Sequence, residues 1–431
     1  MALRTENGVE ANKVAVSSSS PHREGFFSNI KAIPKGVFAV SLFGLFLGMS
    51  TTMVYSQIGM FMKTVLHADE QTIAMVDGIV EYIAFACRIF SGVLSDYLSD
   101  RKSILLAGCL LTLFARPILS IASSPLMVIM IQAIERLGNG FQATPRDSLI
   151  ADLSPMENRG KSYGLSRSLK TTGALIGTPI AILIMYLSCN NYRIVFLCSA
   201  IPVALAILCV LKIKTPKGDI VDGKPRKKST RFENPLQIKY LKTLDRSFWS
   251  VLLFAFIFEL SHFSESLFPI YASQYLSKTW TGTESMCISI GQVIMSFPIG
   301  FLADKFGKAR LIQICIACMI LANMSLAFWH SIFGVYLGAF LWGGQMTAIQ
   351  GLFLSLISER VDIHVRGTAI GVYYVTVGTA YFLASTIAGG IWSSHGGKWA
   401  YIYSLCIASF AFVIFRFLLP KKYDDRNSKM C

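Results

Sequence analysis

Apolar residues in this chain are gathered in long blocks instead of the one-sided stripes of soluble helices. Each block has about twenty residues, the length that an α-helix needs to cross the ~30 Å hydrocarbon core of a bilayer. The blocks cover residues 36–62, 71–95, 103–122, 125–147, 163–188, 192–211, 248–272, 280–302, 309–330, 332–357, 366–392 and 398–419. The pattern therefore predicts an all-α polytopic membrane protein with twelve transmembrane helices in a lipid bilayer.

The composition agrees with this prediction and excludes a soluble globular protein. Of the 431 residues, 53% are hydrophobic and 15% are charged, whereas soluble chains carry about 25% charged residues. The connections between the blocks are mostly too short for a catalytic domain, so we expect no enzyme. The Cys315-x-x-Cys318 pair lies in an apolar block without a His or an acidic neighbour, so it predicts small buried residues and no metal site.

The distribution of basic residues predicts the orientation. If both termini are cytoplasmic, 33 of the 40 Lys and Arg residues lie in cytoplasmic tails, loops and adjoining helix ends, and four lie in outer connections. Cytoplasmic loops carry such an excess, so the net charge of +15 requires no nucleic-acid partner. Residues 1–35 have no apolar core and predict a cytoplasmic tail instead of a signal peptide. No outer loop has an N-x-S/T sequence, which favours a bacterial inner membrane.

The chain also divides into two similar halves. A basic linker, residues 212–247, separates six predicted helices in residues 36–211 from six in residues 248–419, and a tail of residues 420–431 follows. Gly92-Val-Leu-Ser-Asp96 recurs 208 residues later as Gly300-Phe-Leu-Ala-Asp304. Arg159-Gly160-x-x-x-Gly164 recurs 207 residues later, starting at Arg366. Two motifs at nearly one offset indicate a duplicated six-helix unit, as in secondary transporters whose site lies between two halves.

These motifs resemble those of the major facilitator superfamily over residues 36–419. The family's loop signature, roughly G-x-L-A-D-x-x-G-R-K, is matched closely by Gly300, Asp304, Gly307 and Arg310, and less well by Gly92, Asp96 and Arg101, because Ser and Asp replace the usual Gly and Arg. The resemblance implies two six-helix bundles and a loop that holds the outward-facing state, with each Asp at a helix N-terminus.

Two further segments carry the resemblance. Arg136-Leu-Gly-Asn139-Gly140 is similar to the R-x-x-Q-G signature of the fourth helix, whose arginine the family ties to proton coupling. The segment from Ala143 to Asp152 resembles a bacterial subgroup without an agreed substrate. The antiporter motif G-P-x-x-G-G is absent from the fifth helix, where Gly173-x-x-x-Gly177-Thr-Pro179 is the nearest match. The resemblance thus implies a transporter and leaves its substrate open.

Charged residues in the middle of predicted spans are the first candidates for function, since each costs at least ~2.5 to 3.5 kcal/mol to insert. At ~100° per residue, Asp77, Glu81 and Arg88 fall within roughly 40° of one face of span two. The proton-coupling candidates are Glu81, Asp77, Arg136 and Glu259. The alternative is a set of permanent ion pairs that hold helices together, which is the interpretation favoured for Arg116.

Other polar residues are candidates for a substrate cavity. Glu259, His262 and Glu265 recur every three residues along span seven, so a His between two carboxylates suggests a proton relay, with a packing role for His262 as the alternative. Glu135 points ~100° away from Arg136 and so suits a pair with another helix. The cavity candidates are Arg88, Glu135, Lys170, His262, Glu265, Gln292, Gln345 and Tyr373.

Three functions remain open. The mixed charges and the missing antiporter motif favour proton-coupled uptake of a small polar or charged organic solute by a monomer. The alternatives are proton-exchanging efflux of drugs or metabolites and a non-transporting receptor or scaffold. Gly160-Lys161-Ser162 is no phosphate loop, because Pro155 stands where that motif needs Gly. We therefore expect the proton gradient, without a cofactor, to be the energy source.

Overall fold

The structure, a computed structural model, describes residues 34–97, 101–154, 159–213, 220–221, 224–225, 244–361 and 366–418. The elements of the first half are α2 (Lys35–Thr64), α3 (Glu70–Tyr97), α4 (Arg101–Ser120), α5 (Pro125–Leu153), α6 (Arg159–Leu187), α7 (Tyr192–Cys198) and α8 (Ala200–Leu211). Two short antiparallel strands follow, β1 (Ile220–Val221) and β2 (Lys224–Pro225).

The second half contains α10 (Arg246–Glu259), the 3-10 helix η2 (Glu265–Leu267), α11 (Phe268–Ala272), α12 (Thr283–Phe306), α13 (Lys308–Phe328), α14 (Ile332–Arg360), α15 (Arg366–His395) and α16 (Gly397–Leu418). Within the described residues, eight helices are long and apolar enough to cross a membrane. Each predicted span coincides with one helix or with a broken pair. The helical fold is therefore as predicted, although the count of twelve spans stays a prediction.

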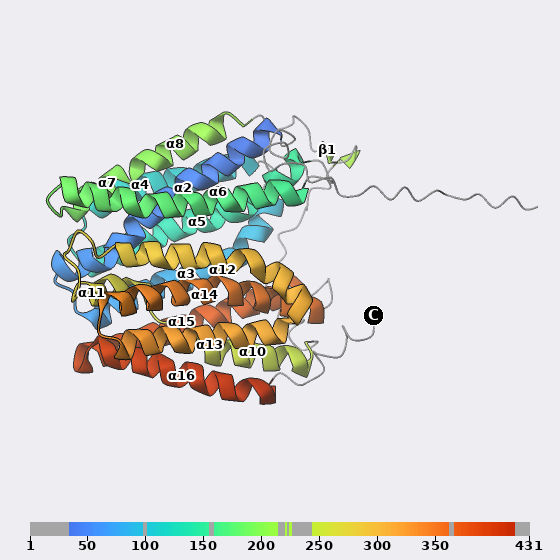
Figure 1. The fold of residues 1–431 in the computed structure, drawn as a ribbon. Helices are drawn as coiled ribbons and strands as arrows, with labels where there is room; N and C mark the ends of the chain where they lie inside the picture. Colours follow the sequence, from blue (N-terminus) through green and yellow to red (C-terminus); the bar gives the residue numbers. More distant parts are fainter. Residues whose placement is uncertain are drawn as a thin grey trace, which may run out of the picture.

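The helices form two groups that lie side by side (Figure 1). One group contains α2 to α8 and the other contains α10 to α16, and the groups meet where α3 packs on α15, α6 on α12, and α2 on α11. The described chain begins and ends at one end of the bundle (Figure 1). We call the opposite end, where the short connections after α2, α6 and α11 lie, the far end.

The predicted span 248–272 is not one continuous helix. The helix α10 ends at Glu259, residues 260–264 are not helical, and η2 and α11 continue the path. Pro269 lies in the first turn of α11, a position at which its missing N–H is tolerated. The three-residue spacing from Glu259 to Glu265 therefore does not describe one helical face, which corrects the sequence interpretation.

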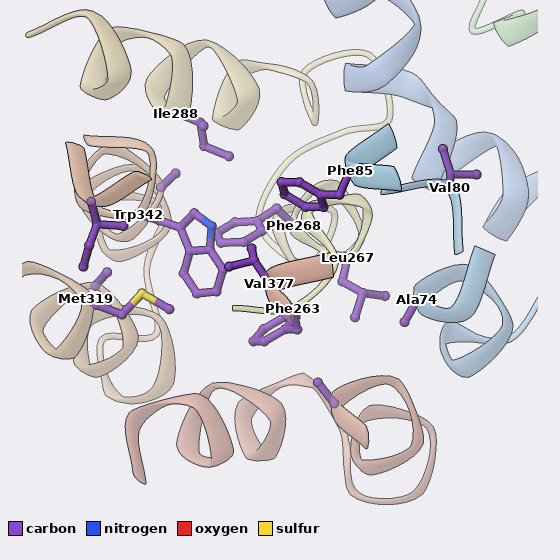
Figure 2. Packing of buried hydrophobic residues seen from close by; sticks show 14 of the residues in the cluster. Ala74, Val80, Phe85, Phe263, Leu267, Phe268, Ile288, Met319, Trp342 and Val377 are labelled. Atoms are coloured by element: carbon purple, nitrogen blue, oxygen red, sulfur yellow. The ribbon is translucent and has the colours of Figure 1, made fainter. Parts of the chain in front are cut away.

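A buried apolar cluster joins the two groups at this break. Figure 2 shows Ala74, Val80 and Phe85 of α3 on one side and Phe263 and Leu267 of the broken segment on the other. Farther along the cluster, Phe268 contacts the Trp342 indole of α14 with ring centroids 5.1 Å apart. This packing fixes the broken segment against α3 and so positions the polar residues beside it.

Candidate functional site

A cavity of about 270 Å³ lies between the two helix groups. This volume is slightly below the usual range for small-molecule sites, about 300 to 1,000 Å³. Its charged lining residues are Glu81, Arg88, Arg136, Glu259 and Glu265. Most of the others are polar: Thr51, Thr52, Tyr55, Ser56, Thr178, Ser285, Ser289, Gln292, Thr347, Gln350 and Tyr381. The apolar ones are Phe85, Ile288 and Met346, so the cavity suits a small polar solute.

The first half contributes an ion pair to the cavity wall. An Arg136 Nη2 of α5 lies 2.5 Å from a Glu81 Oε1 of α3. The Arg136 guanidinium also lies 5.8 Å from the centre of the Tyr55 ring on α2. The side chains of Arg136 and Glu81 keep 20% and 18% of their surface exposed. Solutes that enter the cavity can therefore reach this pair.

Asp77 lies one helical turn before Glu81 and connects the two helix groups. It is 3% exposed, and the Ser264 hydroxyl in the break after α10 donates a hydrogen bond of 2.7 Å to its Oδ2. The Tyr381 hydroxyl of α15 donates a longer bond of 3.4 Å to the same oxygen. Asp77 is thus a junction between α3 and the second group and is not itself part of the cavity wall.

The second half places Glu259 and Glu265 on the cavity wall and His262 behind it. His262 Nδ1 lies 3.7 Å from a Glu259 Oε2, too far for a strong hydrogen bond. Its Nε2 lies 2.7 Å from the Gln345 Nε2. A hydrogen bond joins the Gln345 amide to the His262 ring, and its direction depends on the tautomer of the imidazole. The ring is also packed against Phe258 and Trp342, so His262 and Gln345 form a buried support.

The other predicted residues have different surroundings. Glu135 pairs with the fully buried Arg116 of α4 at 2.8 Å and does not line the cavity. The Lys170 side chain is exposed on α6 and is also absent from the wall. Tyr373 is buried against Phe353 and Tyr374. Arg88 and Gln292 do line the cavity, and their role as substrate contacts stays a prediction.

The loop-signature residues lie at the end of the bundle that carries the termini. Gly92 and Asp96 belong to the C-terminal part of α3, and Gly300 and Asp304 to that of α12. A helix N-terminus near either Asp must therefore belong to another helix. The side chains of both Asp residues and of Arg101 lie outside the described part. Two further signature residues begin α13: Gly307 precedes it with a φ of +83°, which favours glycine, and Arg310 is exposed in its first turn.

Many polar residues near the site were not anticipated from the sequence, and four of them stand out. Tyr55 and Tyr381 line the cavity, and Ser264 bonds to Asp77. Glu284, at the start of α12, is fully buried and accepts a 2.6 Å hydrogen bond from the Ser285 hydroxyl. Single hydroxyl groups within apolar blocks give no distinctive signal. Glu284 lies close to a predicted outer connection, where carboxylates are common and do not indicate a functional site.

Several contacts close the bundle at its far end. Besides the two hydrogen bonds to Asp77, the Thr279 hydroxyl donates a 2.7 Å bond to Asn190, and the Gln71 N–H donates a 3.2 Å bond to Ser393. Each bond joins one helix group to the other. Gly59 of α2 also lies against the backbone of Ser266 in η2. The structure is therefore a state with the far end closed above the cavity.

The sequence has relatives along most of its length. It is 25% identical over 375 residues to an uncharacterised MFS-type transporter of Methanocaldococcus jannaschii. The aligned region covers 84% of this chain and 90% of that relative. It is 24% identical to an MFS-type transporter of Gibberella zeae, and the alignment covers 93% of this chain and 91% of that relative. An uncharacterised protein of Mycobacterium tuberculosis is 22% identical, with 81% and 82% covered.

Solved structures share the fold at low sequence identity. A nucleoside transporter, NupG, superimposes with a TM-score of 0.70 at 13% identity and covers 89% of this chain and 98% of its own. A D-xylose-proton symporter has a TM-score of 0.67 at 16% identity, with 92% and 98% covered. The Major Facilitator Superfamily model matches residues 40–279 and 260–429. The two helix groups, the cavity between them and this match agree, and the chain belongs to the Major Facilitator Superfamily as a transporter of that type.

Proposed function

We propose that the protein is a secondary transporter that couples the uptake of a small polar or charged organic solute to protons. The observation that carries this proposal is the Glu81–Arg136 ion pair in the wall of a polar cavity between the two helix groups. A carboxylate at such a position changes its partner when it gains a proton, because the neutral form attracts the guanidinium much less. Solute and proton can then act on the same cavity.

The transport cycle follows from the closed far end. With the termini in the cytoplasm of a bacterial cell, this structure is the inward-facing state, and opening of the far-end contacts gives the outward-facing state. Binding of solute and proton changes the relative populations of the two states only by its differential affinity for them. Asp77 takes part in this exchange because its two partners, Ser264 and Tyr381, belong to the opposite group.

The small size and polar lining of the cavity support a metabolite over a bulky apolar drug. Two of the structural neighbours are named for a nucleoside and for xylose with a proton. At 13% and 16% identity they indicate the fold, and the proposal rests on the cavity residues. One chain contains both helix groups and the whole cavity, so we propose that a monomer is the transporting unit.

The test is transport into proteoliposomes under an imposed inward proton gradient. A mixed pool of metabolites is offered outside, and the contents are read by mass spectrometry against empty liposomes. We expect gradient-dependent accumulation by the wild type and none by Glu81→Gln. Glu70→Gln is the matched control, because Glu70 pairs with Lys63 at the start of α3, away from the cavity. Loss of preloaded solutes in place of accumulation would identify export, and accumulation that ignores the gradient would refute proton coupling.

A further inference from the structure

The cavity wall of the second half is acidic. Glu259 and Glu265 are its only charged members among the described residues. The basic residues of residues 247–415 lie in connections or near helix ends: Lys278, Lys305, Lys308, Arg310, Arg360, Arg366 and Lys398. Neither glutamate therefore has a Lys or Arg partner at cavity depth from its own half.

Glu259 also lacks a strong partner within the described part of the chain. It is 6% exposed, its carboxylate accepts no hydrogen bond from the described residues, and the His262 Nδ1 lies 3.7 Å from its Oε2. The Glu265 Oε1 is buried and likewise accepts none. A buried carboxylate without compensation is costly. The site is thus incomplete without a positively charged group or protons.

The first half does not supply that group through its ion pair. Arg136 is engaged by Glu81 at 2.5 Å. Arg88 lies over the rings of Phe85 and Tyr374, with its Cζ 5.0 and 5.6 Å from their centres. Arg136 thus contacts α3 and α2, and Arg88 contacts α3 and α15, whereas the two glutamates flank the break after α10.

The break gives the two carboxylates a common direction. Glu259 is the last residue of α10 and Glu265 the first of η2, so the non-helical residues between them let both side chains reach one cavity. The facing helix α12 presents Ser285, Ser289 and Gln292 at spacings of four and three, along one face. This wall therefore offers hydroxyl and amide oxygens as hydrogen-bond acceptors beside the two carboxylates.

We propose that the transported solute carries a protonated amine, which binds between Glu259 and Glu265 and donates its third N–H to a hydroxyl of α12. This inference rests on the proposed function and names the chemistry of its solute. A primary ammonium group has three donors and no acceptor, which matches two carboxylates and one hydroxyl. The solute is a simple amine or an amino acid, and the amine is common to both.

The test measures binding to the purified, detergent-solubilised protein by thermal shift at neutral pH. The probes are putrescine, a simple diamine, and L-ornithine, an amine with a carboxylate. Butyramide and butyrate are the neutral and anionic controls. We expect putrescine, ornithine or both to raise the melting temperature, and butyramide and butyrate to have no effect. Binding of putrescine alone identifies the simple-amine class, and binding of ornithine alone the amino-acid class.

The variants test the residues. We expect Glu259→Gln and Glu265→Gln each to weaken amine binding at least about tenfold, since hydrogen bonds to charged groups carry this much affinity. Glu70→Gln should leave it unchanged. Should a Gln variant fail to fold, Glu259→Asp and Glu265→Asp keep the charge while shifting it, and should weaken binding by a smaller factor.

The outcomes separate this inference from the proposed function. If neither amine binds, or if amines bind the Gln variants as well as the wild type, the inference is refuted. Proton-driven accumulation of a neutral or anionic solute by the same wild-type protein would then leave the proposed function in place. Amine binding without any proton-dependent transport would support the amine site and refute the proposed coupling.

Discussion

The closed far end depends on a close approach between Gly59 and the broken segment. A Cβ atom built on Gly59 would lie 2.0 Å from the Ser266 carbonyl oxygen and 2.9 Å from its carbonyl carbon. Both are backbone atoms, so no flexible side chain can move aside. Gly59 belongs to α2 in the first group and Ser266 to η2 in the second. We therefore expect Gly59→Ala to act on the contact between the groups instead of the fold of either group.

The size of the effect follows from the distances. Ordinary van der Waals contact begins at 3.4 Å, so the two backbones must separate by 1.4 Å, the difference from 2.0 Å. Overpacking of this kind costs about 1 to 3 kcal/mol. The ratio of the far-end-closed state to the open state should then fall by roughly 5-fold to 150-fold. The melting temperature should change little, because separation of the groups relieves the clash.

The assay is a distance distribution between spin labels at the far end. Labels at Leu187→Cys in α6, where the native side chain is 71% exposed, and at Ser277→Cys, after α11, report the separation of the groups. The background has Cys189, Cys406 and Cys431 replaced by Ser. We expect wild type to populate mainly the short distance and Gly59→Ala mainly a longer one.

Two other glycine-to-alanine variants serve as controls for Gly59→Ala. A Cβ on Gly164 would meet nothing within 4 Å, so Gly164→Ala should behave as wild type. A Cβ on Gly173 would lie 2.0 Å from the Leu45 carbonyl oxygen within the first group, so Gly173→Ala should lower stability in either state. An unchanged distance distribution in a stable Gly59→Ala protein would refute the claim that this contact defines the closed far end.

Three further predictions follow from the charged residues. Glu81→Gln should keep the solute affinity within about threefold in the thermal-shift assay, because the substitution removes proton coupling but preserves the shape of the cavity. Arg116→Met should lower the free energy of unfolding by about 3 to 5 kcal/mol in chemical denaturation, and Arg116→Met with Glu135→Leu by much less, because the single change leaves a buried charge unpaired. Asp77→Ala removes two cross-group hydrogen bonds and should lengthen the same spin-label distance in a smaller fraction of molecules than Gly59→Ala does.

The sequence predicts the helical segments well because the bilayer requires long apolar blocks. The predicted start at residue 125 agrees with α5, which begins at Pro125. The predicted end at residue 147 is six residues short of the observed end at Leu153. The helix continues for these six residues after the charged residues Arg146 and Asp147, at which the apolar block ends. Hydropathy thus locates the part of a helix that the membrane would cover, and the polar continuation gives no comparable signal.

Side-chain partners are predicted less well because they are not local. The angular separation of Glu135 and Arg136 indicates different directions, and the structure supplies Arg116 and Glu81 as their separate partners. Nothing in the sequence relates Asp77 to Tyr381, which lies 304 residues away. The break after α10 is also not predicted, although residues 261–266 are mostly polar, because polar residues occur within membrane-spanning helices as well.

The two ion pairs of α5 differ in one property that assigns their roles. Arg116 and Glu135 keep 0% and 9% of their side-chain surface exposed, so no solute can reach them and their pairing is permanent. The side chains of Arg136 and Glu81 keep 20% and 18% of their surface exposed, at least twice the value for Glu135, and they face the cavity. A pair that can exchange partners with a proton or a solute must be accessible to it. Neighbouring residues on one helix can thus serve packing and transport respectively, and exposure to the cavity distinguishes them.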